Sequence, residues 1–193
     1  DAAVQFAQAM ADRPIATHTA DANAQHYELP AAFFEAVLGP RLKYSSGLYP
    51  PGALSLAEGE AAALRETESH ADLRDGQAVL ELGCGWGSLS LWMAERFPAS
   101  TITAVSNSTS QRAFIQARAA ERGLANLTVV TADMNVFDTD RRFDRVVSVE
   151  MFEHMSNWRA LLARVRTWLK PDGLLFLHVF SHATTPYRFE TED

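Results

Sequence analysis

Short apolar runs alternate with segments of helical spacing along the chain after residue 76. Strands are predicted at the apolar runs, over 78–82, 101–105, 127–131, 143–149 and 174–179. Helices are predicted over 87–96, 110–123 and 157–169, the last closed by the turn sequence Lys170-Pro171-Asp172-Gly173. This rhythm is typical of βαβ units, which form a parallel sheet. Because ligands of such sheets bind outside the carboxyl ends of the strands, the residues that follow the first four strands are the first candidates for chemistry.

Helical patterns without strands occupy the first 72 residues. Helices are predicted over 1–12, 29–38 and 54–71, with a linker at 13–25 and a loop at 45–53 that contains two prolines. Ser55 and Glu58 have the spacing of a capping box, which favours a helix start there. We therefore expect two parts: an N-terminal helical segment over 1–72 on the substrate side, and an α/β core over 73–193.

Composition and charge narrow the class of partner. The chain has 193 residues, of which 47% are hydrophobic, and a net charge of -7. This acidity disfavours a nucleic-acid partner, and no apolar run is long enough for stable membrane insertion. The single cysteine, Cys84, excludes an internal disulfide and favours a cytoplasmic location. The missing initial Met and the charged last residues lead us to expect part of a longer protein, and a homo-oligomer is compatible with the sequence without being indicated by it.

A glycine-rich loop follows the first predicted strand, in the sequence Glu81-Leu82-Gly83-Cys84-Gly85-Trp86-Gly87-Ser88. Glycine lets the backbone turn sharply and approach a ligand, so we expect Gly83, Cys84, Gly85 and Gly87 to contact a cofactor. A dinucleotide is disfavoured, because Ser88 replaces the last glycine of its fingerprint and no acid ends the second strand. Cys84 is interpreted as a small packing residue rather than a nucleophile. A turn without a ligand is the alternative.

Polar residues also follow the second and third predicted strands. Asn107 and Gln111 carry amides, which offer donors and acceptors to a ribose. Asp133 offers a carboxylate to an adenine amino group, and Met134 offers an apolar side chain beside the ring. Taken alone, Asp133 is more typical of a helix cap than of an adenine ligand.

Several motifs together resemble one enzyme superfamily. The glycine-rich loop resembles that of class I methyltransferases, and it is accompanied by HYELP at 26–30, KYSSG at 43–47, NSTSQ at 107–111 and VEMFEHM at 149–155. The set resembles the superfamily of cyclopropane-fatty-acid synthases, mycolic acid methyltransferases and plant coclaurine-type N-methyltransferases. The N-methyltransferase branch is the most similar.

The resemblance implies a Rossmann-like class I methyltransferase fold with five parallel strands in this chain and more strands after residue 193. It implies S-adenosylmethionine (SAM) as cofactor and S-adenosylhomocysteine (SAH) as product. It places Tyr44 and Ser45 at the methionine end of SAM. Val149 is also expected to contact the cofactor. The residues expected on the substrate side are Tyr27, Glu28, Phe152 and His178. There Glu28 would face an ammonium group, and Tyr27 would stack on it.

The segment after the fourth predicted strand carries the candidate catalytic groups Glu150, Glu153 and His154. If 150–154 forms a helical turn, these side chains share one face. An amine must lose its proton before it can accept a methyl group, and a carboxylate beside an imidazole raises the basicity of the imidazole. We therefore expect methylation of a small amine with general-base assistance. The alternative interpretation of the two acids is that they favour a helix N-terminus.

Two other functions stay open. A lipid-modifying enzyme of the same superfamily would add a methylene or methyl group to an acyl double bond, with a bicarbonate ion as base. The ligands of that ion would map to Glu153, His178 and Ser46, and the lipid enzymes carry a cysteine at the position of Ser46. A non-catalytic SAM-binding module is the other function, although the intact candidate base argues against it. No metal site is expected, because His178 and His182 lack a third ligand at suitable spacing.

Overall fold

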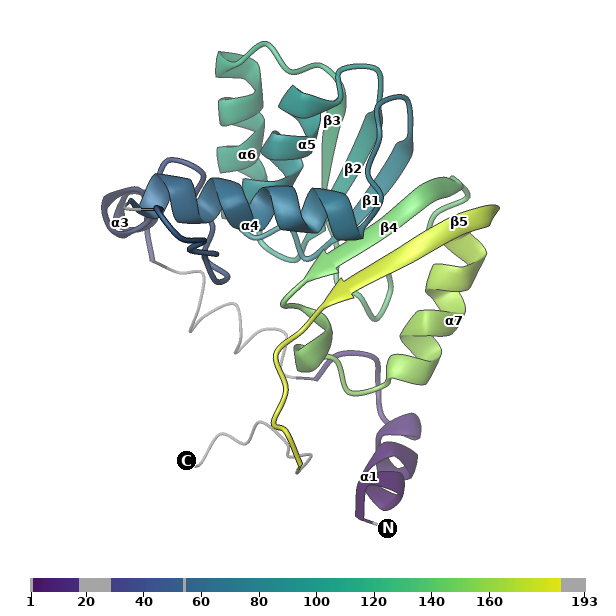
Figure 1. Ribbon diagram of the computed structural model, residues 1–193. Coiled ribbons are helices and arrows are strands. Elements are labelled where there is room, and N and C mark those ends of the chain that lie inside the picture. The colour runs from purple at the N-terminus through teal and green to yellow at the C-terminus, as the bar shows by residue number, and fades with distance from the viewer. Residues whose placement is uncertain (1, 18–28, 54, 185–193) are drawn as a thin grey trace.

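A five-stranded parallel sheet forms the centre of the molecule (Figure 1). The computed structural model describes residues 2–17, 29–53 and 55–184. The strands are β1 (Ala78–Leu82), β2 (Thr101–Ser106), β3 (Leu127–Thr131), β4 (Phe143–Val149) and β5 (Leu169–His178), in the order β3-β2-β1-β4-β5. Every neighbouring pair is parallel, so all carboxyl ends lie at one edge of the sheet. The predicted parallel βαβ core is confirmed.

Helices cover both faces of this sheet. They are α1 (Ala2–Ala11), α3 (Ala31–Val37), α4 (Leu56–His70), α5 (Ser88–Arg96), α6 (Thr109–Glu121) and α7 (Trp158–Trp168), with a short 3-10 helix η1 (Phe152–His154). On one face, Val79 of β1 belongs to a hydrophobic cluster with Leu64 of α4 and Met93 of α5. On the other face, Leu80 of β1 belongs to a cluster with Leu161 of α7. Consecutive residues of β1 are thus buried on opposite faces, as expected for a parallel sheet with two covered faces.

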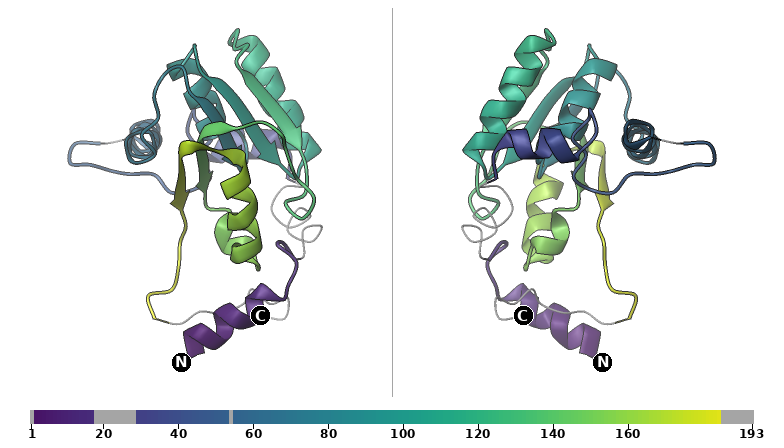
Figure 2. Two further views of the ribbon diagram at one scale, coloured as in Figure 1. Left: turned by 90° about the vertical axis from the view of Figure 1, so that its right-hand side faces the viewer. Right: turned by 90° about the vertical axis from the view of Figure 1, so that its left-hand side faces the viewer.

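The N-terminal helices meet the core at two separate places. Helix α1 lies beside α7, at the end of the molecule far from α6 (Figures 1 and 2). The amide of Asn157, just before α7, donates to the carbonyls of Ala11 and Arg13 at 2.8 Å each. Helix α3 instead contacts the glycine-rich loop, where the Phe34 and Trp86 rings lie 4.9 Å apart. None of the described helices has the length and apolar character needed to cross a membrane.

Side-chain caps begin three of the helices. The predicted capping box is confirmed: the Ser55 hydroxyl accepts from the Glu58 amide, and the Glu58 carboxylate accepts from the Ser55 amide at 2.9 Å. The Ser108 hydroxyl accepts from the Gln111 amide, and Asn157 caps α7 in the same way. Each such cap typically contributes about 1 kcal/mol and fixes where the helix starts relative to the strand before it.

The last strand differs from its sequence prediction. We predicted a turn at 170–173 followed by a strand over 174–179, whereas β5 begins at Leu169. Leu169 pairs with Phe143 and Leu174 pairs with Arg145, so four residues of β5 stand opposite a single residue of β4. The turn sequence therefore forms an irregularity inside the strand, because pairing to β4 continues on both sides of it.

Gly87 should be among the least replaceable residues of the fold. Its φ is +83°, and an added Cβ would lie 2.6 Å from Cγ1 of Ile115, a fully buried side chain of α6. Gly123→Ala is a matched control, because Gly123 also has a positive φ (+67°) but has open space around it. We expect Gly87→Ala to lose about 1–3 kcal/mol more in free energy of unfolding than Gly123→Ala, measured by urea denaturation. Equal losses of unfolding free energy in the two variants would show that the contact with Ile115 does not restrict the residue at position 87.

Candidate active site

The glycine-rich loop is pinned across the ends of β1 and β2. The amides of Gly83 and Cys84 both donate to the carbonyl of Val105 at 3.0 Å. Gly83, Gly85 and Gly87 all have positive φ, a conformation that favours glycine. A Cβ on Gly83 would lie 2.6 Å from Cβ of Met151, so the segment that follows β4 comes into close contact with this loop. Burial raises the pKa of the Cys84 thiol well above its ordinary value, which keeps the thiol protonated and agrees with a packing role.

Four buried polar atoms near the ends of β1, β2 and β3 have no hydrogen-bond partner among the described residues. They are Nε1 of Trp86, Oγ of Ser88, Nε2 of Gln111 and Oγ1 of Thr131. The other amide atom of Gln111, Oε1, accepts from the Ser106 hydroxyl at 2.6 Å, which fixes the side chain of Gln111. Ser106 and Thr131 are register partners on neighbouring strands. Each unpartnered buried polar group costs about 1–3 kcal/mol, so these atoms fit a site that binds a polar ligand.

Two expected cofactor contacts also take part in the local structure. The Asp133 carboxylate accepts from the Asn135 amide two residues further on at 2.8 Å, which is an Asx-turn rather than a helix cap. Met134 is 8% exposed and belongs to the core cluster that contains Leu80 and Leu161, on the α7 face of the sheet. Asn107 directly follows β2 and is partly buried.

The segment after β4 adopts a different shape from the helical turn expected over 150–154. Glu150 has φ of +51°, and its amide donates to the carbonyl of His178 at the end of β5 at 2.8 Å. The 3-10 helix begins only at Phe152, so Glu150 lies before it, and the three candidate groups do not share one helix face. The condition under which the three side chains would share one face is therefore not met. A left-handed backbone at a non-glycine residue costs about 1–2 kcal/mol, and such strain gathers at functional sites.

Glu153 has a partly buried carboxyl group. Its Oε1 accepts from the Phe180 amide at 3.4 Å, and its Oε2 is buried without a partner among the described residues. Burial raises the pKa of Glu153, and the negative charge of Glu150 adds to this rise. His154 is exposed next to Glu153, and its ring lies 6.4 Å from the Phe180 ring. A carboxyl group with a raised pKa beside an accessible imidazole can take up and release a proton.

The expected substrate-side residues have different positions. Tyr27 and Glu28 lie outside the described residues. Phe152 is fully buried in the core, against the Trp158 ring at 5.4 Å. His178 is partly buried and ends β5, one strand away from Val149 at the end of β4.

A loop between α3 and α4 carries Tyr44 and Ser45, and sequence reasoning missed how this loop is held. The carboxylate of Glu60, a fully buried residue of α4, accepts from the amides of Gly39, Arg41 and Lys43 at 2.8–3.1 Å. The Tyr44 ring is exposed and makes an edge contact with Phe34. The Ser45 hydroxyl accepts from Nζ of Lys43 at 2.5 Å. No sequence signal indicated this anchor, because Glu60 is one of several acids in the sequence of α4.

The chain matches the model of the mycolic acid cyclopropane synthetase family over residues 15–191. It belongs to this family. Among the curated relatives, (S)-coclaurine N-methyltransferase of Papaver somniferum is 37% identical over 179 residues, which cover 93% of this chain and 51% of that protein. Cyclopropane-fatty-acyl-phospholipid synthase of Escherichia coli K12 is 34% identical over 163 residues, or 83% of this chain and 41% of that protein. The chain thus spans about half the length, or less, of these relatives.

A solved structure agrees closely with the described fold. Coclaurine N-methyltransferase, solved with N-methylheliamine and SAH, aligns with a TM-score of 0.95 at 35% identity, over 100% of this chain and 55% of that one. The likeness confirms the expected Rossmann-like fold of class I methyltransferases.

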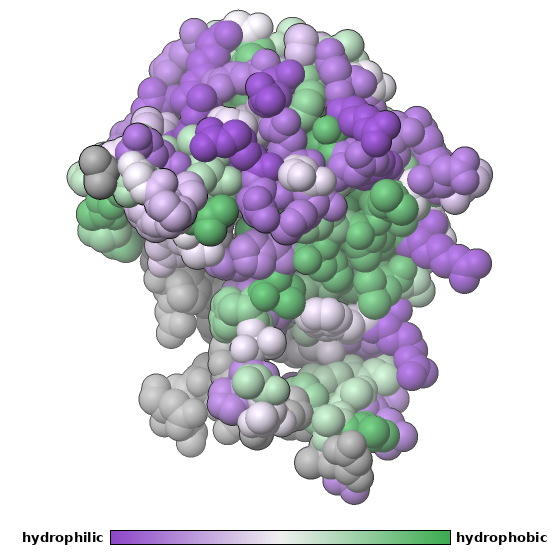
Figure 3. All heavy atoms as spheres, viewed as in Figure 1, coloured by the Kyte–Doolittle hydropathy of each residue, from purple (hydrophilic) through white to green (hydrophobic). Residues whose placement is uncertain are grey.

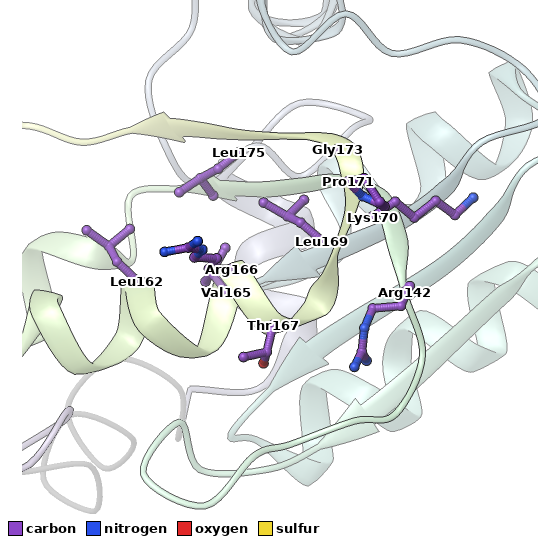
Figure 4. Close-up of a pocket in the computed structure, with 10 residues that line it drawn as sticks. All are labelled: Arg142, Leu162, Val165, Arg166, Thr167, Leu169, Lys170, Pro171, Gly173 and Leu175. Atoms are coloured by element: carbon purple, nitrogen blue, oxygen red, sulfur yellow. The ribbon is translucent and has the colours of Figure 1, made fainter.

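A hollow of about 710 Å³ lies away from the candidate site (Figure 4). It is lined from α7 and from the start of β5, including Leu162, Leu169 and Pro171. Apolar side chains gather on the surface over the opposite face of β5, which is turned to the viewer (Figure 3). The hollow is therefore at the amino end of β5, whereas the glycine-rich loop and the candidate base lie at the carboxyl ends, where ligands of parallel sheets bind.

The buried carboxyl group of Glu81 should make the stability of the ligand-free protein depend on pH. This β1 residue is 4% exposed, its carboxyl group accepts from the Ser90 hydroxyl, and burial raises its pKa from 4.5 to about 7. The folded state therefore holds this proton more tightly than the unfolded chain does. The resulting stabilisation is fully present below pH 4.5 and is lost as the pH rises through 7, by up to about 3 kcal/mol.

Replacement of Glu81 by Gln tests this effect. Because the amide does not ionise, we expect the stability of Glu81→Gln relative to the original protein to increase between pH 5 and pH 8, as measured by urea unfolding at both values. Parallel pH profiles of the two proteins would contradict a raised pKa at Glu81.

Proposed function

We propose that the protein is a SAM-dependent methyltransferase that methylates a small amine on nitrogen. The observation that carries the proposal is the position of Glu150, Glu153 and His154 at the carboxyl end of β4, against the glycine-rich loop. The similarity to coclaurine N-methyltransferase in sequence and structure supports it. The two acids favour a cationic substrate, and the negative net charge argues against nucleic acid.

The cofactor proposal rests on the fit of the residues at the strand ends. SAM, when bound, supplies a methyl group activated by a sulfonium. The loop that contains Gly83, Gly85 and Gly87 lets the backbone approach a ligand, and the unpartnered Nε2 of Gln111 and Oγ1 of Thr131 are available to a polar nucleoside. The cofactor contacts we propose are Tyr44, Ser45, Gly83, Cys84, Gly85, Gly87, Asn107, Gln111, Asp133 and Val149. Met134 contributes only as packing below them.

The proposed roles of the acidic residues follow from their surroundings. An ammonium group is attracted by the carboxylates, but it must lose its proton to expose the nitrogen lone pair. Glu153, whose pKa is raised by burial, is suited to receive a proton, and the exposed His154 can pass it to solvent. Glu150 supplies negative charge beside the pair. Tyr27, Glu28 and His178 remain proposed substrate contacts, and a cytoplasmic location remains a proposal.

A lipid substrate is the second candidate, because the family model and the Escherichia coli relative include lipid-modifying enzymes. The buried, unpartnered Oε2 of Glu153 can donate to an anion such as bicarbonate when the carboxyl is protonated. Under this alternative, His178 and Ser46 would complete the bicarbonate site. Ser46 retains a hydroxyl donor at this position.

Incubation with methyl-labelled SAM distinguishes the candidates. We would offer a panel of secondary and tertiary amines in parallel with unsaturated phospholipid vesicles, each with and without bicarbonate. We expect the label to enter an amine, with no dependence on bicarbonate. Label in the vesicles with stimulation by bicarbonate would favour the lipid alternative, and an absence of SAH formation with every acceptor would favour a binding module.

The proposed base is tested by Glu153→Gln and His154→Ala. We expect each to lower kcat for the amine by about 10²- to 10⁴-fold, because proton removal is impaired. The Kd for SAH, measured by calorimetry, should stay within about threefold, because neither group is proposed to bind the cofactor. His70→Ala is a matched control, since His70 is an exposed histidine 3.2 Å from Glu66 at the end of α4. A normal rate in His154→Ala would exclude His154 from the proton path.

A further inference from the structure

Lysine is rare in this chain, and one of its lysines is buried beside the candidate site. The sequence contains 17 basic residues, of which only Lys43 and Lys170 are lysines. Lys170 lies at the start of β5, where its half-exposed side chain forms an ion pair with Asp144 at 2.8 Å. Lys43 is only 6% exposed. A chain that uses arginine for nearly all its positive charges thus places a lysine where the charge is enclosed.

The ammonium group of Lys43 has specific surroundings. Nζ donates to the Ser45 hydroxyl at 2.5 Å, while the backbone amide of the same residue donates to the buried carboxylate of Glu60. Burial lowers the pKa of Lys43, and the negative charges of Glu150 and Glu60 act in the opposite direction. Of these two carboxylates, Glu60 is already bonded to three backbone amides of the loop. Glu150 lies elsewhere, directly after the end of β4.

A buried ammonium group is costly unless hydrogen bonds and opposite charges compensate it. Here the compensation comes from three groups: the Ser45 hydroxyl on the loop itself, Glu60 on α4, and Glu150 after β4. Because Glu150 also repels Glu153, a positive charge near Glu150 offsets the repulsion between the two acids. The compact ammonium of lysine suits this role better than the larger, planar guanidinium of arginine, which needs room for five donors.

We propose that Lys43 is a positioning residue. Its buried ammonium group holds the Ser45 hydroxyl and balances the charge of Glu150. The loop that carries Tyr44 and Ser45 is thereby docked against the end of β4. The inference deepens the proposed function, and it rests on that function where it concerns methyl transfer. Lys43 acts through Ser45 and Glu150, and it needs no contact with the reacting atoms. Loss of Lys43 should disturb both cofactor binding and turnover, because Ser45 is a proposed cofactor contact and Glu150 lies beside the proposed base.

Lys43→Met removes the charge and keeps most of the side-chain volume, and Lys170→Met is its matched control. We expect Lys43→Met to raise the Kd for SAH about tenfold and to lower kcat for the amine by at least about tenfold. Lys43→Arg should recover part of both losses, because it restores the charge but not the compact geometry. Lys170→Met should leave SAH affinity and kcat unchanged. A folded Lys43→Met protein with unchanged Kd and kcat would overturn the proposal.

A spectroscopic measurement separates this proposal from the proposed function. In NMR spectra of the 193-residue protein labelled with ¹³C at lysine Cε, two lysine signals are expected. The signal that disappears in Lys170→Met belongs to Lys170, and the other belongs to Lys43. Saturation with SAH should shift the Lys43 signal and leave the Lys170 signal in place. If no amine is methylated but the Lys43 signal responds to SAH, the amine function fails and the role of Lys43 stands. If SAH binds and the Lys43 signal does not move, the role of Lys43 fails, whether or not Lys43→Met folds.

Discussion

The parallel direction of all five strands is the constraint on which the rest of the molecule depends. Because the carboxyl ends lie at one edge, the segments that follow β1, β2, β3 and β4 meet there although up to about 70 residues separate them in sequence. Contact between Gly83 and Met151 is a direct result, since β1 and β4 are neighbours in the sheet. The N-terminal part has no strand, and it reaches this edge through the amides held by Glu60.

Sequence patterns predicted the sheet well, since a strand buried on both faces needs an unbroken apolar run. The bounds of β1, β3 and β4 match their predictions. Less could be predicted where a long-range contact decides the structure. Nothing local indicates that Glu60 turns inward to bind a loop about 20 residues earlier, or that Lys43 is enclosed. Strand pairing to β4 likewise overrides the turn sequence at 170–173.

The candidate site was predicted in its location but only partly in its arrangement. Motif residues such as Gly83 and Gln111 lie at the strand ends as expected, because the motif and the strand order both require it. Met134 and Phe152 are packed in the core, since apolar residues beside a site also serve the hydrophobic cluster beneath it. Glu150 departs from the expected turn because its backbone follows the bond to His178. Side-chain roles at a strand end therefore depend on neighbouring strands that the motif does not contain.

The left-handed backbone at Glu150 sets stability against chemistry at a single residue. Glycine is the residue best suited to φ of +51°, and it would relax the chain at this point while deleting the carboxylate. Selection or engineering for heat resistance alone would therefore favour the loss of an acid that the proposed chemistry uses. Under the proposed chemistry, the glutamate at this position exchanges some thermodynamic stability for a functional group.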